Sequence, residues 1–79
     1  MKIHELKITP EYFEAVRTRR KQFELRKDDR GYEVGDLVRL KEYENGDYTG
    51  REIGLYIIIY ILRNCPEYGL QEGYCILGF

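Results

Sequence analysis

Residues 19–32, RRKQFELRKDDRGY, hold the densest group of side chains able to bind or transform a charged ligand. Between positions 17 and 30, seven basic residues stand with three acidic ones, a local charge of +4 in a chain whose net charge is −1. Lysine and arginine hold phosphates, arginine also stacks on rings, and a carboxylate accepts hydrogen bonds from a base. This chemistry predicts a ligand with phosphate and a base, bound by Lys21, Arg26 and Glu24.

Part of this charge also has a structural explanation. The arginines of residues 17–20 follow a predicted helix, where cations interact favourably with the negative end of the helix dipole. In residues 22–26, QFELR, apolar and polar side chains alternate as in a strand. If Phe23 and Leu25 face the core, the neighbouring charges form an ion pair on the other face, which contributes at most about 1 kcal/mol when exposed. Periodicity alone favours this ion pair over a binding site.

Lys21 and Glu24 are also the candidates for catalysis. A lysine acts as a general base when burial or neighbouring cations lower its pKa. Arg19 and Arg20 would lower the pKa of Lys21, whereas Glu24 would raise it. The residues alone therefore leave a catalytic Lys–Glu pair open.

No metal site is expected. Cys65 and Cys75 are ten residues apart and the single histidine, His4, is remote from both in sequence, which does not fit a four-ligand zinc site. Two free, reduced thiols are predicted. His4 shares its parity with Leu6 and Ile8, which favours a core histidine bonded to the backbone. As the only side chain with an ordinary pKa near neutrality, it also stays a candidate for the binding site.

Length and composition indicate one globular domain over residues 1–79, because 43% of the residues are hydrophobic and 34% are charged. The longest apolar run, residues 53–62, is about half of the ~20 residues that a bilayer requires. The start lacks the apolar stretch of a signal peptide. We therefore expect a soluble, cytoplasmic protein with no membrane partner.

The predicted helix has a clear start. Thr9 is suited to cap it through its side-chain oxygen, and Pro10 is favoured at the first helical position. Ile8 before the cap and Phe13 at the fourth helical position would form a hydrophobic staple. On the buried side, Val16 and Tyr12 are expected beside Phe13.

The remaining pattern predicts strands joined by turns. Asn45-Gly46 is a hairpin signal, and Gly50 suggests a bulge or bend. Residues 53–62 are apolar on both parities, which predicts a central strand covered on both faces. Strands are expected in residues 2–8, 22–26, 37–43, 53–62 and 73–79. This order predicts an α+β fold, in which a small, mostly antiparallel barrel of about five strands is capped by one helix between strands 1 and 2.

Several segments together resemble a known family. The string Lys21-x-x-Glu24-x-Arg26, followed by Asp29-Arg30 and Val34-Gly35-Asp36, resembles the signature G-x-K-x-x-E-x-R of the ASCH domain, which has a PUA-like β-barrel. Further strings are similar to a small bacterial and phage ASCH-like subfamily: His4-x-Leu6-Lys7, Tyr12-Phe13, Tyr48-Thr49-Gly50-Arg51 and Gly69-Leu70-x-x-Gly73-Tyr74. The resemblance covers nearly the whole chain. It implies a cleft between helix and barrel, lined by the signature residues Lys21, Glu24 and Arg26. The further candidate contacts are His4, Arg30 and Tyr48. For Arg30 the residues favour a salt link that fixes its loop, and for Tyr48 a ring pair with Tyr43 across the hairpin explains the position.

One position departs from the signature. Arg19 stands where the ASCH pattern has glycine, at the junction of helix and strand. Glycine there would permit a left-handed backbone or the close approach of a ligand. Arginine implies a turn that tolerates a side chain, or a wider cationic rim around the cleft.

The resemblance also implies function. ASCH domains are similar to RNA-binding PUA domains, so RNA, a nucleotide or a modified nucleoside is the implied partner, without a cofactor. Some ASCH proteins are amidohydrolases of acylated cytidine nucleosides that use a lysine, a threonine three residues later and a distant glutamate. Lys21 matches this set, but Glu24 replaces the threonine. The hydrolase is therefore the alternative, and a protein-interaction module is the third possibility. The sequence does not indicate the oligomeric state.

Overall fold

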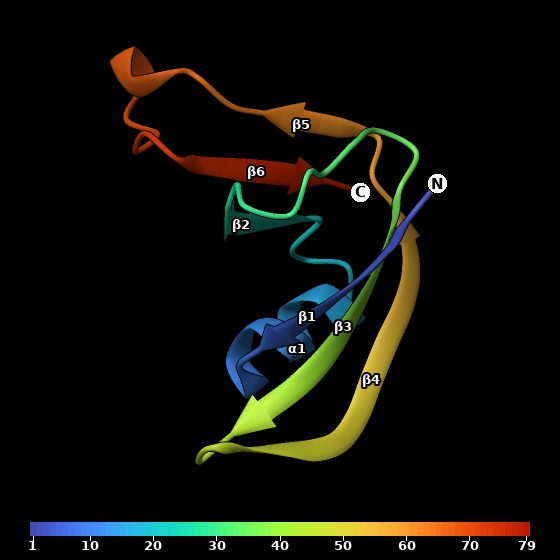
Figure 1. Ribbon diagram of the computed structural model, residues 1–79. Helices are drawn as coiled ribbons and strands as arrows, with labels where there is room; N and C mark the ends of the chain where they lie inside the picture. Colours follow the sequence, from blue (N-terminus) through green and yellow to red (C-terminus); the bar gives the residue numbers. More distant parts are fainter.

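The computed structural model describes all residues, 1–79, as an α+β fold with one α-helix and mostly antiparallel strands (Figure 1). The strands are β1 (Ile3–Ile8), β2 (Phe23–Lys27), β3 (Leu37–Glu44), β4 (Asp47–Ile57), β5 (Tyr60–Leu62) and β6 (Tyr74–Gly78). The helix α1 (Pro10–Arg17) lies between β1 and β2 as predicted, and a short 3-10 helix, η1 (Pro66–Tyr68), precedes β6.

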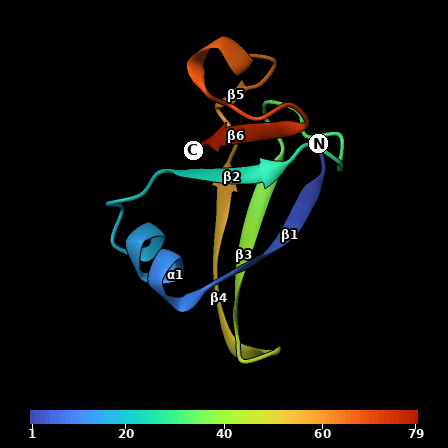
Figure 2. The same cartoon turned by 90° about the vertical axis from the view of Figure 1, so that its left-hand side faces the viewer.

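The six strands form two separate three-stranded sheets rather than the expected set of about five. The first sheet has the order β1-β3-β4, with β1 parallel to β3 and β4 antiparallel to it. The second has the order β2-β6-β5 and is antiparallel throughout. Figure 2 shows β2 and β6 running across the ends of β3 and β4. Strand pairing does not join the two sheets, so the hydrogen-bonded strands do not close into a ring.

The start of α1 follows the prediction except for the cap. Pro10 occupies the first turn and Thr9 has an extended backbone, but the Thr9 side chain makes no capping hydrogen bond. Its carbonyl oxygen instead accepts the first helical bond, from Phe13 N at 2.8 Å. Ile8 and Phe13 are both buried in the same core cluster, where the predicted staple requires them.

The prediction of one central strand over residues 53–62 is wrong. The run ends β4, which lies at an edge of the first sheet, and then forms β5, at an edge of the second. Ile58, between the two strands, is fully buried, while Leu55 and Ile59 are exposed. The residues of this run that pack on the core are Ile53, Tyr56, Ile58 and Ile61. The inward parity therefore changes from odd to even within β4, where the register with β3 shifts, and returns to odd where the chain passes into β5.

Local turn signals identified the hairpin correctly. Asn45 and Gly46 have positive φ angles of 53° and 81° and join β3 to β4. Gly50, with φ of 93°, lies where the register of β3 and β4 shifts between Lys41 and Tyr43. The predicted bulge or bend is therefore present.

The core lies between α1 and the two sheets. Phe13 and Val16 come from the helix, and they pack with residues of both sheets, among them Leu6, Leu40 and Leu77. Both cysteines are free and buried, as predicted, and burial raises the pKa of the Cys75 thiol. Among the helices, none has the length and apolar character required to cross a membrane.

Candidate functional site

The apolar side chains of β2 face outwards and its carboxylate faces inwards, the reverse of the arrangement expected from the alternation of residues 22–26. Phe23 and Leu25 are 46% and 55% exposed, whereas Glu24 is only 5% exposed. The cause is the register with β6, which places Glu24 opposite Leu77, a fully buried core residue. Directly opposite residues of an antiparallel pair share a face, so Glu24 points inward with Leu77. The alternation of β2 is as predicted, but its inner face carries Glu24 instead of Phe23 and Leu25.

The Glu24 carboxylate is held between two cations. Lys21 Nζ donates a hydrogen bond to Glu24 Oε1, and Arg26 Nε donates to Glu24 Oε2 at 3.1 Å. Lys21 also donates to the carbonyl oxygen of Phe23 at 2.8 Å, and Arg26 donates to that of Lys7. Two cations therefore share one carboxylate, and both are also held by backbone carbonyls.

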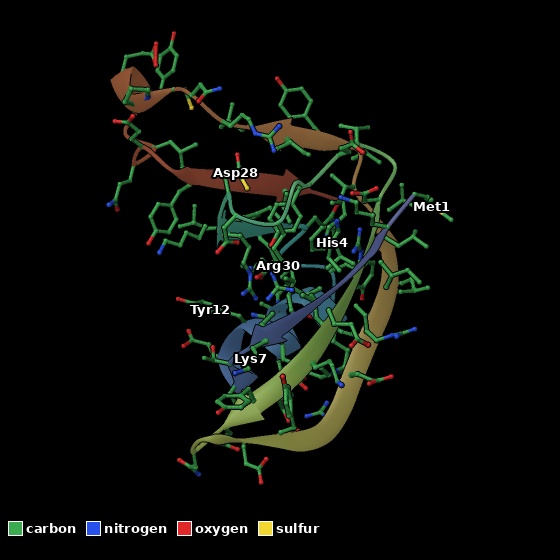
Figure 3. All side chains as sticks on the ribbon, in the orientation of Figure 1. Met1, His4, Lys7, Tyr12, Asp28 and Arg30 are labelled. Carbon is green, nitrogen blue, oxygen red and sulfur yellow. The ribbon has the colours of Figure 1, made fainter.

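A hollow of about 340 Å³ opens beside this carboxylate. Its volume lies within the range of small-molecule sites. Lys21 Nζ lies 5.2 Å from the ring centre of Tyr12 and 4.9 Å from that of Phe23. Figure 3 shows Tyr12 on the outer side of α1, below β2. We call this hollow the β2 pocket; its walls are Tyr12, Lys21, Phe23, Glu24 and Leu25.

Backbone groups also face the β2 pocket, because β2 is an edge strand that pairs only with β6. Asp28 N donates a hydrogen bond to Gly73 O at 2.9 Å, so Asp28 is a residue whose backbone bonds towards β6. In this register the other even-numbered residues of β2 bond towards β6 as well. Backbone direction alternates along an antiparallel ladder. The N–H and C=O of Leu25 therefore point to the free edge, the same edge at which Phe23 O accepts its bond from Lys21. They offer one donor and one acceptor to a ligand.

His4 lies outside the β2 pocket. It is buried on the inner face of β1, as its parity predicted, but its partner is a carboxylate and not the backbone: His4 Nε2 lies 2.8 Å from Asp36 Oδ2. Asp36 also accepts bonds from the backbone N–H groups of Lys2 at 3.0 Å and Glu33 at 3.1 Å. The bond to His4, followed by the bond to Lys2, lowers the pKa of Asp36 from 3.8 to about 2.

Arg30 and Tyr48, two further candidates, also lie apart from the β2 pocket. Arg30 Nη1 donates to Glu5 O at 3.0 Å, so it caps the free edge of β1 (Figure 3). Tyr48 packs edge to face with Tyr43, their ring centres 5.2 Å apart, as expected for rings that flank the hairpin. The structure thus brings together Lys21, Glu24 and Arg26, and separates His4, Arg30 and Tyr48 from them.

Position 19 accommodates arginine in a turn where the ASCH signature has glycine. Its φ angle is +63°, in the left-handed region that favours glycine. The side chain turns back onto the fold, where Arg19 Nη2 donates to Phe79 O at 3.3 Å and the guanidinium lies 5.2 Å from the ring centre of Tyr56. The turn therefore tolerates a side chain, and Arg19 packs against the C-terminal residue.

A third buried carboxylate, Glu42, was not predicted from the sequence. Glu42, 5% exposed, accepts bonds from Thr49 Oγ1 at 2.7 Å and from Arg51 Nη1 at 3.5 Å. Arg51 also binds Glu14 of α1 at 2.8 Å. This network ties the helix to the β3–β4 hairpin and explains the Thr49-Gly50-Arg51 string structurally. The only signal of this network in the sequence is the acidic residue Glu42 at a position of the buried parity in β3.

Tyr12 was also missed as a site residue, because it was expected on the buried side of α1. It is 52% exposed and forms a wall of the β2 pocket. Phe13, its neighbour, turns to the core instead. No group of three or more His, Cys, Asp or Glu side chains is placed to hold a metal ion.

Comparison with known proteins places the chain in a family. An uncharacterized 12.9 kDa protein in the GpA 3′ region of Escherichia phage P2 is 46% identical over 52 residues. The match covers 66% of this chain, which spans about half (48%) of the length of that curated relative. A family model described as a domain of unknown function, DUF3850, matches residues 3–79. Since this match covers nearly the whole chain, the protein belongs to the DUF3850 family.

Proposed function

We propose that the β2 pocket binds the base of an RNA, a nucleotide or a modified nucleoside, and that the chain is a single, cytoplasmic domain of the PUA-like ASCH type. The observation that carries this proposal is the Glu24 carboxylate, 5% exposed, held by two cations at the wall of an aromatic hollow. Enclosing a carboxylate removes its hydration, which is costly for a purely structural ion pair. A ligand that uses its remaining hydrogen-bonding capacity would explain its placement.

The aromatic walls support a flat ligand. Tyr12 and Phe23 are both half exposed, and both rings lie close to Lys21 Nζ. Unpaired bases are recognised by stacking on such rings. A base that displaces the Lys21 side chain from between the rings, or lies over one of them, would bury apolar area on both partners.

The polar groups support recognition of a base edge rather than of phosphate. A carboxylate has about four lone-pair sites, and the cations occupy one on each oxygen of Glu24. The spare sites suit the amino group of a base, and the Leu25 backbone offers a donor and an acceptor beside them. Lys21 and Arg26 already share Glu24, so phosphate binding is assigned to the rim, where Arg20 is exposed.

The experiment is a thermal-shift screen of nucleosides, ribonucleoside monophosphates and short RNAs. A ligand at 100 times its dissociation constant adds about 2.7 kcal/mol to the stability. We expect Glu24→Gln to weaken binding by about tenfold or more, because the amide lacks the charge that orders the two cations. The matched control is Glu67→Gln, which makes the same change at an exposed position in η1. Equal binding by the two variants, or no ligand at low salt, would contradict the proposal.

A hydrolase of acylated cytidine is the second candidate, on one observation: Lys21 Nζ directly contacts the Glu24 carboxylate at the pocket wall. In this reaction water cleaves the amide bond, and the products are cytidine and a carboxylic acid. The candidate predicts release of cytidine from acetylcytidine by the wild-type protein and none by Lys21→Ala. A pure preparation that releases no cytidine would eliminate it.

The PUA-like fold is a separate part of the proposal. It is supported by one helix between the first two strands and by a second sheet that crosses the end of the first. An experimental structure whose strands superpose on those of ASCH barrels in the same order would establish it. A different strand order would refute this part and leave the β2 pocket to be tested by binding.

A further inference from the structure

The second sheet has one apolar face on which the side chains of Phe23, Leu25, Tyr60 and Leu62 are exposed. In register, Phe23 stands opposite Gly78, and Gly78 stands opposite Tyr60. In the next row Leu25 stands opposite Ile76, and Ile76 opposite Leu62. Because opposite residues share a face, both rows lie on the side away from the core residue Leu77. We call this surface the outer face; it consists of Phe23, Leu25, Tyr60, Leu62, Ile76 and Gly78.

The outer face presents two separated aromatic rings. Phe23 is 46% exposed and Tyr60 is 65% exposed, and each stands on an edge strand of the sheet. Their backbones are two strand spacings apart, roughly 10 Å. Gly78 lies between them and has no side chain, so no side chain of the middle strand separates the two rings in this row. This arrangement suits flat groups stacked on the rings.

Cations without acidic partners lie near both ends of β2. Lys27 has the same parity as Phe23 and Leu25, is exposed, and forms no ion pair or side-chain hydrogen bond. Arg20, shortly before the strand, is exposed and binds only the hydroxyl of Thr18. From Phe23 to Lys27 the strand spans about 13 Å. The outer face itself contains no acidic residue.

We propose that the outer face binds a single-stranded polynucleotide, with bases stacked on Phe23 and Tyr60 and phosphates near Arg20 and Lys27. Stacking platforms joined to cations are the general means of holding single strands, because every base has an aromatic face. A second copy of the chain fits less well, since it would bring the same cations to the rim and no acidic residue on its outer face to pair them. A duplex does not fit, because its bases are already stacked.

The inference rests on the proposed function and extends it. Phe23 and Leu25 belong both to the β2 pocket and to the outer face. A strand lying across the sheet can therefore place one base in the β2 pocket and its neighbours on the outer face. The partner of the site is then an oligonucleotide rather than a free nucleotide.

The experiment compares two probes. Fluorescence anisotropy measures the affinity for a labelled single-stranded RNA of about twelve nucleotides, a length within the range of known single-strand sites. The DNA of the same sequence is measured in the same way. Thermal shift measures the binding of ribonucleoside monophosphates. We expect Tyr60→Ala to weaken oligonucleotide binding by about tenfold, the effect of losing one stacked base, with mononucleotide binding unchanged. Tyr60→Phe, which keeps the ring, should bind like the wild type.

The matched control is Tyr68→Ala, which removes an 88% exposed tyrosine from η1, outside the outer face. It should change neither affinity. The inference is overturned if Tyr60→Ala binds the oligonucleotide as the wild type does, or if the oligonucleotide binds no more tightly than a mononucleotide. It is also overturned if Tyr60→Ala converts a dimer into a monomer in sedimentation without changing oligonucleotide affinity, because the outer face would then be a self-association surface.

The failures of the two proposals differ. If mononucleotides bind and Glu24→Gln abolishes their binding, but Tyr60→Ala has no effect, the β2 pocket stands and the outer face fails. If Glu24→Gln changes nothing, while Tyr60→Ala weakens oligonucleotide binding, the outer face stands and the β2 pocket fails.

Discussion

Two of the three buried carboxylates in this small fold, Asp36 and Glu24, are satisfied in different ways. Asp36, 2% exposed, takes its hydrogen bonds from the buried His4 ring and from two backbone N–H groups. Glu24, 5% exposed, takes them from the long side chains of Lys21 and Arg26, and it faces a hollow. Backbone donors cannot move without unfolding, whereas lysine and arginine side chains can rotate towards a ligand.

This difference separates a scaffold from a site. The Asp36 group joins the start of β1 to the turn before β3, and no hollow adjoins it. The Glu24 group lies on an edge strand with free backbone groups beside aromatic walls. Burial of a carboxylate is therefore not sufficient evidence of function. Glu42 is also buried and held by side chains, yet it ties α1 to the hairpin, and of the three buried carboxylates only Glu24 adjoins a hollow.

The largest effect is expected for Asp36→Ala. The substitution leaves two backbone donors and His4 without their acceptor inside the fold. Breaking a buried ionic network in a domain of this size should lower the melting temperature by on the order of 15 °C. Glu24→Gln should lower it by less than half of that value, because its partners can reach water. Thermal melts followed by circular dichroism test this order, and equal losses would remove the distinction between the two carboxylates.

The Leu25 backbone provides a sharper test of the β2 pocket. Leu25→Pro removes an N–H that does not bond to β6, whereas Leu25→Ala removes only the side chain. We expect the proline variant to bind a nucleotide about five- to tenfold more weakly than the alanine variant, the effect of one hydrogen bond. Calorimetric titration measures the ratio. Both variants must retain a cooperative melt, and identical affinities would show that this N–H does not contact the ligand.

Acid should weaken the Asp36 group. Its pKa is lowered from 3.8 to about 2 in the folded protein, so its stabilising contribution is complete above about pH 4 and is lost as the pH falls towards 2. The bond to His4 is the largest cause. His4→Gln should therefore move the midpoint of acid unfolding to higher pH. Circular dichroism across an acid titration measures the midpoint, and an unchanged value would show that His4 does not stabilise the charged carboxylate.

The smallest effect is expected at the turn that leads into the β2 pocket. Arg19→Gly removes a side chain from a left-handed position, a relief of roughly 1 kcal/mol, offset in part by the greater freedom of glycine in the unfolded chain. We expect a stability gain of less than about 1 kcal/mol. Arg20→Gly is the control, because its φ angle is not positive and glycine should destabilise there. Chemical denaturation compares the two, and a loss at both positions would show that the contacts of Arg19 outweigh its strain.

Local patterns predicted local structure well. The alternation of residues 2–8 matches the burial of β1, and Asn45-Gly46 forms the expected hairpin. The faces of β2 could not be assigned this way, because alternation defines two faces and only the pairing with Leu77 selects the inner one. The His4–Asp36 contact joins residues 32 apart in sequence, and no local pattern encodes it.

The candidate site was predicted in part. The Lys21, Glu24 and Arg26 spacing identified three side chains that do meet. Tyr12 and the free edge of β2 depend on how α1 packs beside the second sheet, which tertiary contacts decide. The run of residues 53–62 failed for the same reason, because two strands in different sheets share one continuous apolar segment.

The central claim is that a base binds in the β2 pocket, and amide chemical shifts test it most directly. Titrating the isotope-labelled protein with the ribonucleoside monophosphates and acetylcytidine should shift the Leu25 amide and the ring signals of Tyr12 and Phe23, while those of His4 and Tyr48 stay in place. Shifts confined to the hairpin around Tyr48, or no shift with any of these ligands, would contradict the claim.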